Sequence, residues 1–118
     1  MSRSLLRLLE RHAAAAAALR RAEAAYREAG RARPAADSTR ARRAAADRAG
    51  AAFEVLAESV VELQSARAAV LAHAVEEGLS ADRIGSFDEA FARTDRELGA
   101  YLAARTYDQV RATANSRA

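Results

Sequence analysis

The sequence predicts an all-α protein, either an elongated antiparallel three-helix bundle or a coiled-coil hairpin, forming a single domain over residues 1–118. Large apolar side chains recur at alternating steps of three and four residues, which is the spacing of a helical seam. Glycine and proline separate the periodic segments, and no segment has the alternation typical of a strand. A fourth helix is expected if the second one breaks at Gly50.

The first helix is expected over residues of about 4–29. Gly30 stands where a helix C-cap belongs, and Pro34 interrupts any continuation. Nearly all positions of the seam are apolar. They are Met1, Leu5, Leu8, His12, Ala15, Leu19, Ala22, Tyr26 and Ala29.

The second helix is expected over residues of about 38–77, with Asp37 or Ser38 as its N-cap and Gly78 after its end. Gly50 is the one position that could bend or break it, because glycine costs about 1 kcal/mol inside a helix. The apolar stripe again follows three-and-four spacing. It consists of Ala45, Ala49, Ala52, Leu56, Val60, Leu63, Ala66 and Val70.

The third helix is expected over residues of about 86–112. The segment from Ser86 to Glu89 matches a capping box, in which the hydroxyl and the carboxylate each satisfy a free backbone N–H. Ser80 is expected to cap only a single turn through Ile84. The inward side chains of the third helix are expected to be Phe87, Phe91, Leu98, Tyr101 or Leu102, and Val110.

Short loops make consecutive helices antiparallel neighbours. A turn near residues 33–34 would place Leu5–Leu9 against Leu56–Leu63. A second turn near residue 82 would place Phe87 and Phe91 against residues 73–75. The three helices then coincide only in a short middle zone, and a two-helix prong extends from each end of it.

Composition indicates a thin hydrophobic core. Of 118 residues, 35 are Ala and only 22 are Leu, Val, Ile, Met or Phe. Cysteine is absent, and all 19 basic residues are Arg, a bias typical of a GC-rich bacterial genome. No apolar run approaches the roughly 18–20 residues that span a bilayer, and the N-terminus does not resemble a secretory signal. We therefore expect a bacterial cytoplasmic protein that does not bind membranes.

Charge is divided unevenly along the chain. Residues 1–50 carry a net charge of +7 and residues 51–118 a net charge of −4. Residues 27–52 contain seven Arg and eleven Ala but no large apolar side chain. This pattern indicates either an arm for an acidic polymer or basic and acidic halves that pair. The candidate residues for an acidic partner or nucleic acid are Arg20, Arg21, Arg27, Arg31, Arg33, Arg40, Arg42, Arg43 and Arg48.

The remaining polar groups give little sign of catalysis. Glu54, Glu58 and Glu62 share one helix face, but no histidine or further acid joins them at the spacing of a di-metal site. We expect a solvated or ion-paired ridge there. No metal, cofactor or catalytic residue is assigned.

Arg67 and His73, in the segment RAAVLAH, resemble the motif of the helical HEPN ribonucleases, and Arg7 and His12 have a similar spacing. The resemblance would imply action on RNA at a dimer interface. Ala68 stands where those enzymes usually carry a polar residue. We therefore assign His12 to the seam and His73 to a helix interface, and we expect no enzymatic activity.

The function expected from the sequence is that of a non-catalytic interaction or assembly protein. It would form a homo-oligomer, or bind another helical protein, through its Ala- and Leu-lined seams. The alternative is an accessory subunit that binds RNA or DNA without sequence preference through the arginine-rich segment 20–48. The packing or oligomer seam is expected to contain Leu5, Leu9, Leu19, Tyr26, Leu56, Val60, Leu63, Val70, Phe87 and Phe91.

Overall fold

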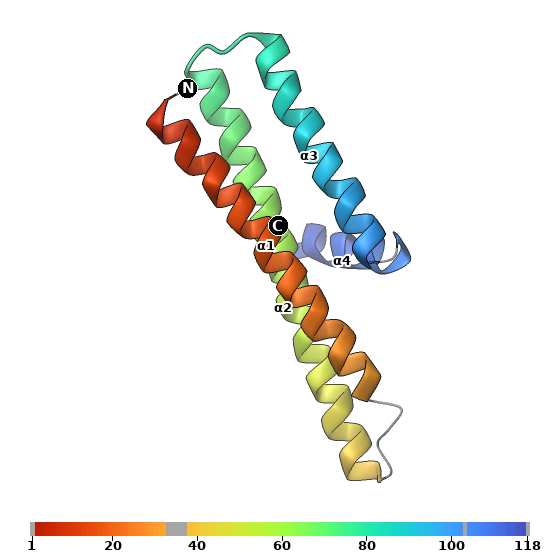
Figure 1. Ribbon diagram of the computed structural model, residues 1–118. Helices are drawn as coiled ribbons and strands as arrows, with labels where there is room; N and C mark the ends of the chain where they lie inside the picture. The colour runs from red at the N-terminus through yellow and green to blue at the C-terminus, as the bar shows by residue number, and fades with distance from the viewer. Residues whose placement is uncertain (1, 33–37, 103, 118) are drawn as a thin grey trace.

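A computed structural model of the protein describes residues 2–32, 38–102 and 104–117 (Figure 1). These residues form four helices and no strand: α1 (Arg3–Ala32), α2 (Thr39–Glu76), α3 (Ala81–Leu102) and α4 (Ala104–Arg117). The molecule is elongated, with principal extents of 60 × 22 × 22 Å. The predicted all-α class and elongated shape are confirmed.

An antiparallel hairpin of α1 and α2 is the backbone of the fold. The buried apolar positions of α1 are Leu5, Ala15, Leu19 and Ala22, which belong to the predicted seam. On α2 the predicted stripe is buried from Ala45 to Val70, except that Ala52 is half-buried. Ser38 is the N-cap of α2, because its hydroxyl accepts a hydrogen bond from the backbone N–H of Ala41.

Both glycines of the hairpin lie inside helices. The expected second helix is confirmed as intact, since α2 runs unbroken through Gly50 from Thr39 to Glu76. The predicted C-cap at Gly30 is wrong, because α1 continues to Ala32. Ala49 before Gly50 and Leu56 after it are both buried, so packing of α2 outweighs the cost of one glycine in the helix. Pro34 and Asp37 lie outside the described residues.

The predicted register of the hairpin is wrong. Leu5 packs with Val70, so Leu5–Leu9 do not face Leu56–Leu63. The residues of α2 that do pack with Ala15, Leu19 and Ala22 are Leu56, Val60 and Leu63. The helices are offset by about two turns from the prediction because α1 extends past Gly30 and the connection reaches residue 38.

The start of α3 also differs from the prediction. Gly78, with a φ of 74°, follows α2, and Ser80 then begins a long helix instead of a single turn. The Ser80 hydroxyl accepts a hydrogen bond from the backbone N–H of Arg83. Ser86 lies inside α3 and donates its hydroxyl to the carbonyl of Asp82, so the predicted capping box is not the start of the helix.

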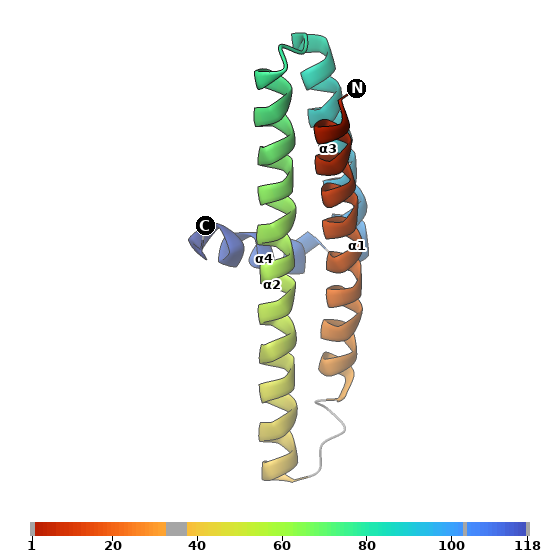
Figure 2. The same ribbon diagram turned by 90° about the vertical axis from the view of Figure 1, so that its left-hand side faces the viewer.

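The predicted third helix over 86–112 is divided into two. From Ala104 onward the chain forms α4, which runs across α2 instead of continuing alongside it (Figure 2). Val110 is fully buried with Leu56, Val60 and Leu63, and Gln64 donates a hydrogen bond to Asn115. Val110 is therefore buried against residues that are distant in the sequence, after the chain has changed direction between α3 and α4. Local helix propensity does not indicate this change of direction. The side chains of Tyr101 and Leu102 lie outside the described part.

Only one end of the hairpin is a two-helix prong. At the other end α3 joins α1 and α2, so that Phe91 is buried against Leu5 and Val70, and Phe87 is half-buried. The predicted second two-helix prong is therefore wrong. We call the remaining prong the arginine arm, defined as residues 20–32 of α1 and 38–52 of α2. Figure 1 shows it extending beyond α3 and α4.

Candidate nucleic-acid interface

On α1, the arginines of the arm are mostly neutralised by carboxylates. The ion pairs join Arg20 to Glu97 of α3 (3.5 Å), Arg27 to Glu23 (2.6 Å) and Arg31 to Glu28 (3.3 Å). The pairs within α1 follow the spacing of three or four residues that brings side chains together on one helix face. These arginines therefore have intrachain partners already.

Glu23 differs from the other carboxylates because it is buried. Its side chain is only 4% exposed, and its Oε1 atom accepts the contact from Arg27. Its Oε2 atom is buried with no hydrogen-bond partner. Removing the charged partner of a buried carboxylate is strongly destabilising. The ion pair between Arg27 and Glu23 is therefore harder to break than an ion pair between exposed side chains.

On α2, by contrast, the arginines of the arm have no ion pair or hydrogen bond from their guanidinium groups to the described residues. The same holds for Arg21 on α1. All of these side chains are exposed. We call the α2 set the α2 edge. It consists of Arg40, Arg42, Arg43 and Arg48.

The α2 edge surrounds the outward side of its helix. With 3.6 residues per turn, Arg40 and Arg43 point away from the buried Ala45 and Ala49, and therefore away from α1. Arg42 and Arg48 lie on the two opposite flanks. The arginines consequently do not form one flat face but present guanidinium groups in several directions around a convex rod.

Little negative charge opposes the α2 edge locally. Asp47 is the one acid in residues 38–52, against four arginines, and the first turn of α2 contains none. The positive end of the helix dipole adds to the field of the arginines there. Between Arg43 and Glu54 the exposed outward positions are Asp47, near the centre of the outward side, and Gly50 and Ala51, which project little beyond the backbone. Arg33, the remaining candidate, lies outside the described residues.

The predicted packing seam makes contacts within the chain. Its fully buried members are Leu5, Leu19, Leu56, Val60, Leu63 and Val70, and Phe91 is nearly so. Leu9, Tyr26 and Phe87 are half-buried against the same two clusters. The buried members are covered within the chain and present no free surface to another chain, whereas Leu9, Tyr26 and Phe87 are partly exposed.

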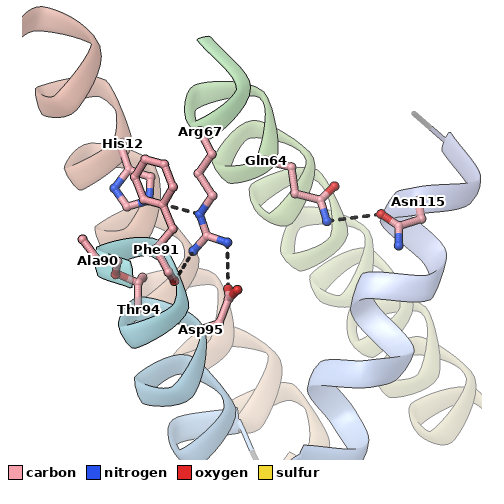
Figure 3. A network of polar contacts seen from close by, with 8 residues as sticks. All are labelled: His12, Gln64, Arg67, Ala90, Phe91, Thr94, Asp95 and Asn115. Atoms are coloured by element: carbon pink, nitrogen blue, oxygen red, sulfur yellow. Dashed lines mark hydrogen bonds and ion pairs between the residues drawn. The ribbon is translucent and has the colours of Figure 1, made fainter. Parts of the chain in front are cut away.

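A polar network that joins α1, α2 and α3 was not predicted from the sequence (Figure 3). Arg67 on α2 donates hydrogen bonds to Nε2 of His12 on α1 (3.2 Å), to Asp95 on α3 (2.8 Å) and to the carbonyl of Phe91 (3.4 Å). Its guanidinium carbon lies 5.5 Å from the centre of the Phe91 ring, which also stacks on His12. In the sequence, only the position of His12 in the apolar seam pointed to this network. The other members could not be identified, because the network combines residues from three helices.

His73 belongs to a different contact. It is hydrogen-bonded to Glu77 (2.8 Å) and lies 3.7 Å from Glu76, whereas Arg67 faces His12 and Asp95. The structure therefore does not bring together the two residues that resemble the HEPN motif. The pKa of Glu77 is lowered, first by a hydrogen bond from Ser2 and then by His73.

The acidic ridge is partly ion-paired. Glu62 binds Arg11 over 2.7 Å, and this hydrogen bond is the main reason why the pKa of Glu62 is lowered. Arg11 also donates to the hydroxyl of Ser65. In the part of the chain that the structure describes, no group of three or more acidic or histidine side chains could hold a metal ion.

Comparisons of this chain with protein-family models, with curated proteins and with solved structures found no match. None of the helices in the described ranges is long and apolar enough to cross a membrane. The uneven pairing of the arginines is therefore the observation from which a function can be argued.

Proposed function

We propose that this chain is a non-catalytic binding protein whose arginine arm holds the phosphate backbone of nucleic acid without sequence preference. The observation that supports the proposal is that the α2 edge has no carboxylate partner in the described structure, although the arginines of α1 mostly do. Guanidinium groups bind phosphate in a bidentate geometry, and a cluster of them attracts a polyanion.

A second copy of the chain is a poorer match for the α2 edge. The carboxylates at Glu23, Glu28, Glu62, Asp95 and Glu97 already have arginine partners. The remaining acids of α3 alternate with exposed arginines along the same helix; they are Asp82, Asp88 and Glu89, beside Arg83, Arg93 and Arg96. Glu54 and Glu58 are exposed on α2, but α3 carries no concentrated negative charge that would complement the α2 edge.

Self-association through the Ala and Leu seam, the function expected first, has less support because the seam side chains are covered within the chain. The exposed large apolar side chains of the described residues are Leu6, Val55 and Val75. Val55 and Val75 are separated by about 30 Å along α2, so they do not form one patch. An oligomer would need a surface other than the predicted seam.

The test is binding to labelled nucleic acid across a salt series, with two unrelated sequences. We expect the logarithm of the association constant to fall linearly with the logarithm of salt, and both sequences to bind equally. The variant R40Q/R42Q/R43Q/R48Q should lose about one unit of salt slope per phosphate contact removed. Glutamine is a good helix former, and circular dichroism checks that α2 remains intact.

A matched control removes the same number of positive charges from residues outside the arginine arm. The variant R7Q/R83Q/R93Q/R96Q replaces four exposed arginines whose guanidinium groups make no hydrogen bond or ion pair to the described residues. It should retain most of the affinity and most of the salt slope. Equal losses of affinity in the two variants would show that net charge alone accounts for binding, and not the α2 edge. Absence of binding by the natural protein at low salt would overturn the proposal.

A further inference from the structure

We infer that the α2 edge binds double-stranded DNA in preference to single strands. This inference rests on the proposed function and specifies the form of its ligand. It follows from three properties of the arm, which are the positions of its aromatic rings, the convex arrangement of its arginines and the continuity of α2.

The arm offers no aromatic ring for base stacking. Its aromatic residue, Tyr26, packs edge-on against Phe53 with ring centres 5.8 Å apart, and both rings are half-buried against the larger core cluster. Sequence-independent proteins that bind single strands combine a basic groove with aromatic side chains on which successive bases stack. The α2 edge therefore lacks the contact that favours unpaired bases over duplex, and only its charge remains.

The arginines are arranged for a ligand that surrounds a helix rather than lies in a groove. Arg40 and Arg43 point outward, while Arg42 and Arg48 extend from opposite flanks of α2. The major groove of B-form DNA is about 12 Å wide and admits one α-helix between two phosphate ridges. Guanidinium groups on both flanks of an inserted helix are placed to reach phosphates of both strands, which a single strand does not supply.

The outward surface of α2 just beyond Arg48 permits close approach. Gly50 and Ala51 are exposed, and a Cβ added at Gly50 would meet nothing within 4 Å in the chain. Nothing within the described fold therefore requires glycine at this position. A minimal side chain on the outward side of α2 lets a phosphate ridge come near the helix backbone.

The continuity of α2 favours a ligand of fixed geometry. The edge spans the nine residues 40–48, or about 12 Å, within one unbroken helix of 38 residues. Arginines held on a rigid helix match phosphates that are held in register by base pairing. A flexible single strand would have to lose conformational entropy to follow them, without stacking to compensate.

The experiment compares a DNA duplex with one of its constituent strands, presented at equal phosphate concentration and over the same salt series. We expect the duplex to bind at least about tenfold more tightly at low salt. The salt slope should also be steeper for the duplex, at roughly −0.9 per contact against roughly −0.7 for the single strand. The variant R40Q/R42Q/R43Q/R48Q should reduce this preference, whereas R7Q/R83Q/R93Q/R96Q should retain it.

The outcomes separate the inference from the proposed function. Equal binding of duplex and single strand, or tighter binding of the single strand, would overturn the preference for duplex while leaving the arm as a nucleic-acid interface. Absence of binding to both ligands at low salt would overturn the proposed function itself. Preference for duplex that persists in the α2-edge variant would place the duplex-binding surface elsewhere and so overturn the inference.

Discussion

Arg67 of α2 donates a hydrogen bond from Nε to Nε2 of His12 on α1 over 3.2 Å. Because Nε2 accepts this bond, the imidazole of His12 is neutral and carries its proton on Nδ1. The same guanidinium binds Asp95 of α3 over 2.8 Å, so one arginine joins three helices. The network joins α1, α2 and α3 in the part of the molecule from which the arginine arm extends.

Protonation of His12 should destabilise the fold. Burial lowers its pKa first, and the charge of Arg67 lowers it further, against an opposing effect of Asp95. A basic group with a lowered folded pKa contributes its full stabilisation above its unfolded pKa of 6.5, and loses it as the pH falls below that value. The melting temperature should therefore fall between pH 7.5 and about pH 5, above the range in which carboxylates titrate.

The control for this pH effect is His12→Gln, whose amide oxygen can still accept from Arg67. This variant should lose most of the fall in melting temperature between the two pH values, while His73→Gln should retain it. An unchanged pH profile in His12→Gln would assign the effect to other groups.

Removal of the Asp95 charge should destabilise the protein. The side chains of Arg67 and Asp95 are 15% and 28% exposed, so Asp95→Asn leaves a mostly buried cation without its carboxylate. We expect the free energy of unfolding to fall by about 1–2 kcal/mol, less than for a fully buried pair. Urea denaturation measures it, with Asp88→Asn as the exposed control. Equal effects of the two substitutions would show that the network contributes nothing specific.

Truncation of Leu19 tests the observed register. Leu19 is fully buried with Leu56, Val60 and Leu63, so Leu19→Ala should lower the free energy of unfolding by about 2–5 kcal/mol. Leu6, which is 47% exposed, is the control, and Leu6→Ala should change stability by less than about 0.5 kcal/mol. A large effect at Leu6, together with a smaller sedimenting species in Leu6→Ala, would instead indicate an interface with another chain.

Replacement of Gly50 should stabilise α2. A Cβ there meets nothing within 4 Å, and Gly50→Ala should raise the free energy of unfolding by about 0.5–1 kcal/mol because alanine is the better helix former. Gly78 is the opposite case, since its φ of 74° is strained for any residue with a Cβ. Gly78→Ala should lower the melting temperature, and thermal denaturation of both variants checks the contrast.

Part of the candidate site was predictable from the sequence. The arginines of the arm stand out because residues 27–52 contain no large apolar side chain. The pairing of Arg27 with Glu23 and of Arg31 with Glu28 follows from helical spacing alone. The pairing of Arg20 with Glu97 could not be anticipated, since it depends on where α3 lies against α1.

The sequence by itself determined that the chain is helical, which faces of α1 and α2 are buried, and where the cations concentrate. These properties are local, because the 3.6-residue repeat and the side chains within one turn decide them. Only the tertiary structure decided the register of the hairpin, the division of the predicted third helix into α3 and α4, and the burial of Phe91. The same holds for the contacts of Arg67. All of them depend on which distant apolar surfaces can be buried together, and a periodic seam can satisfy that requirement at several offsets.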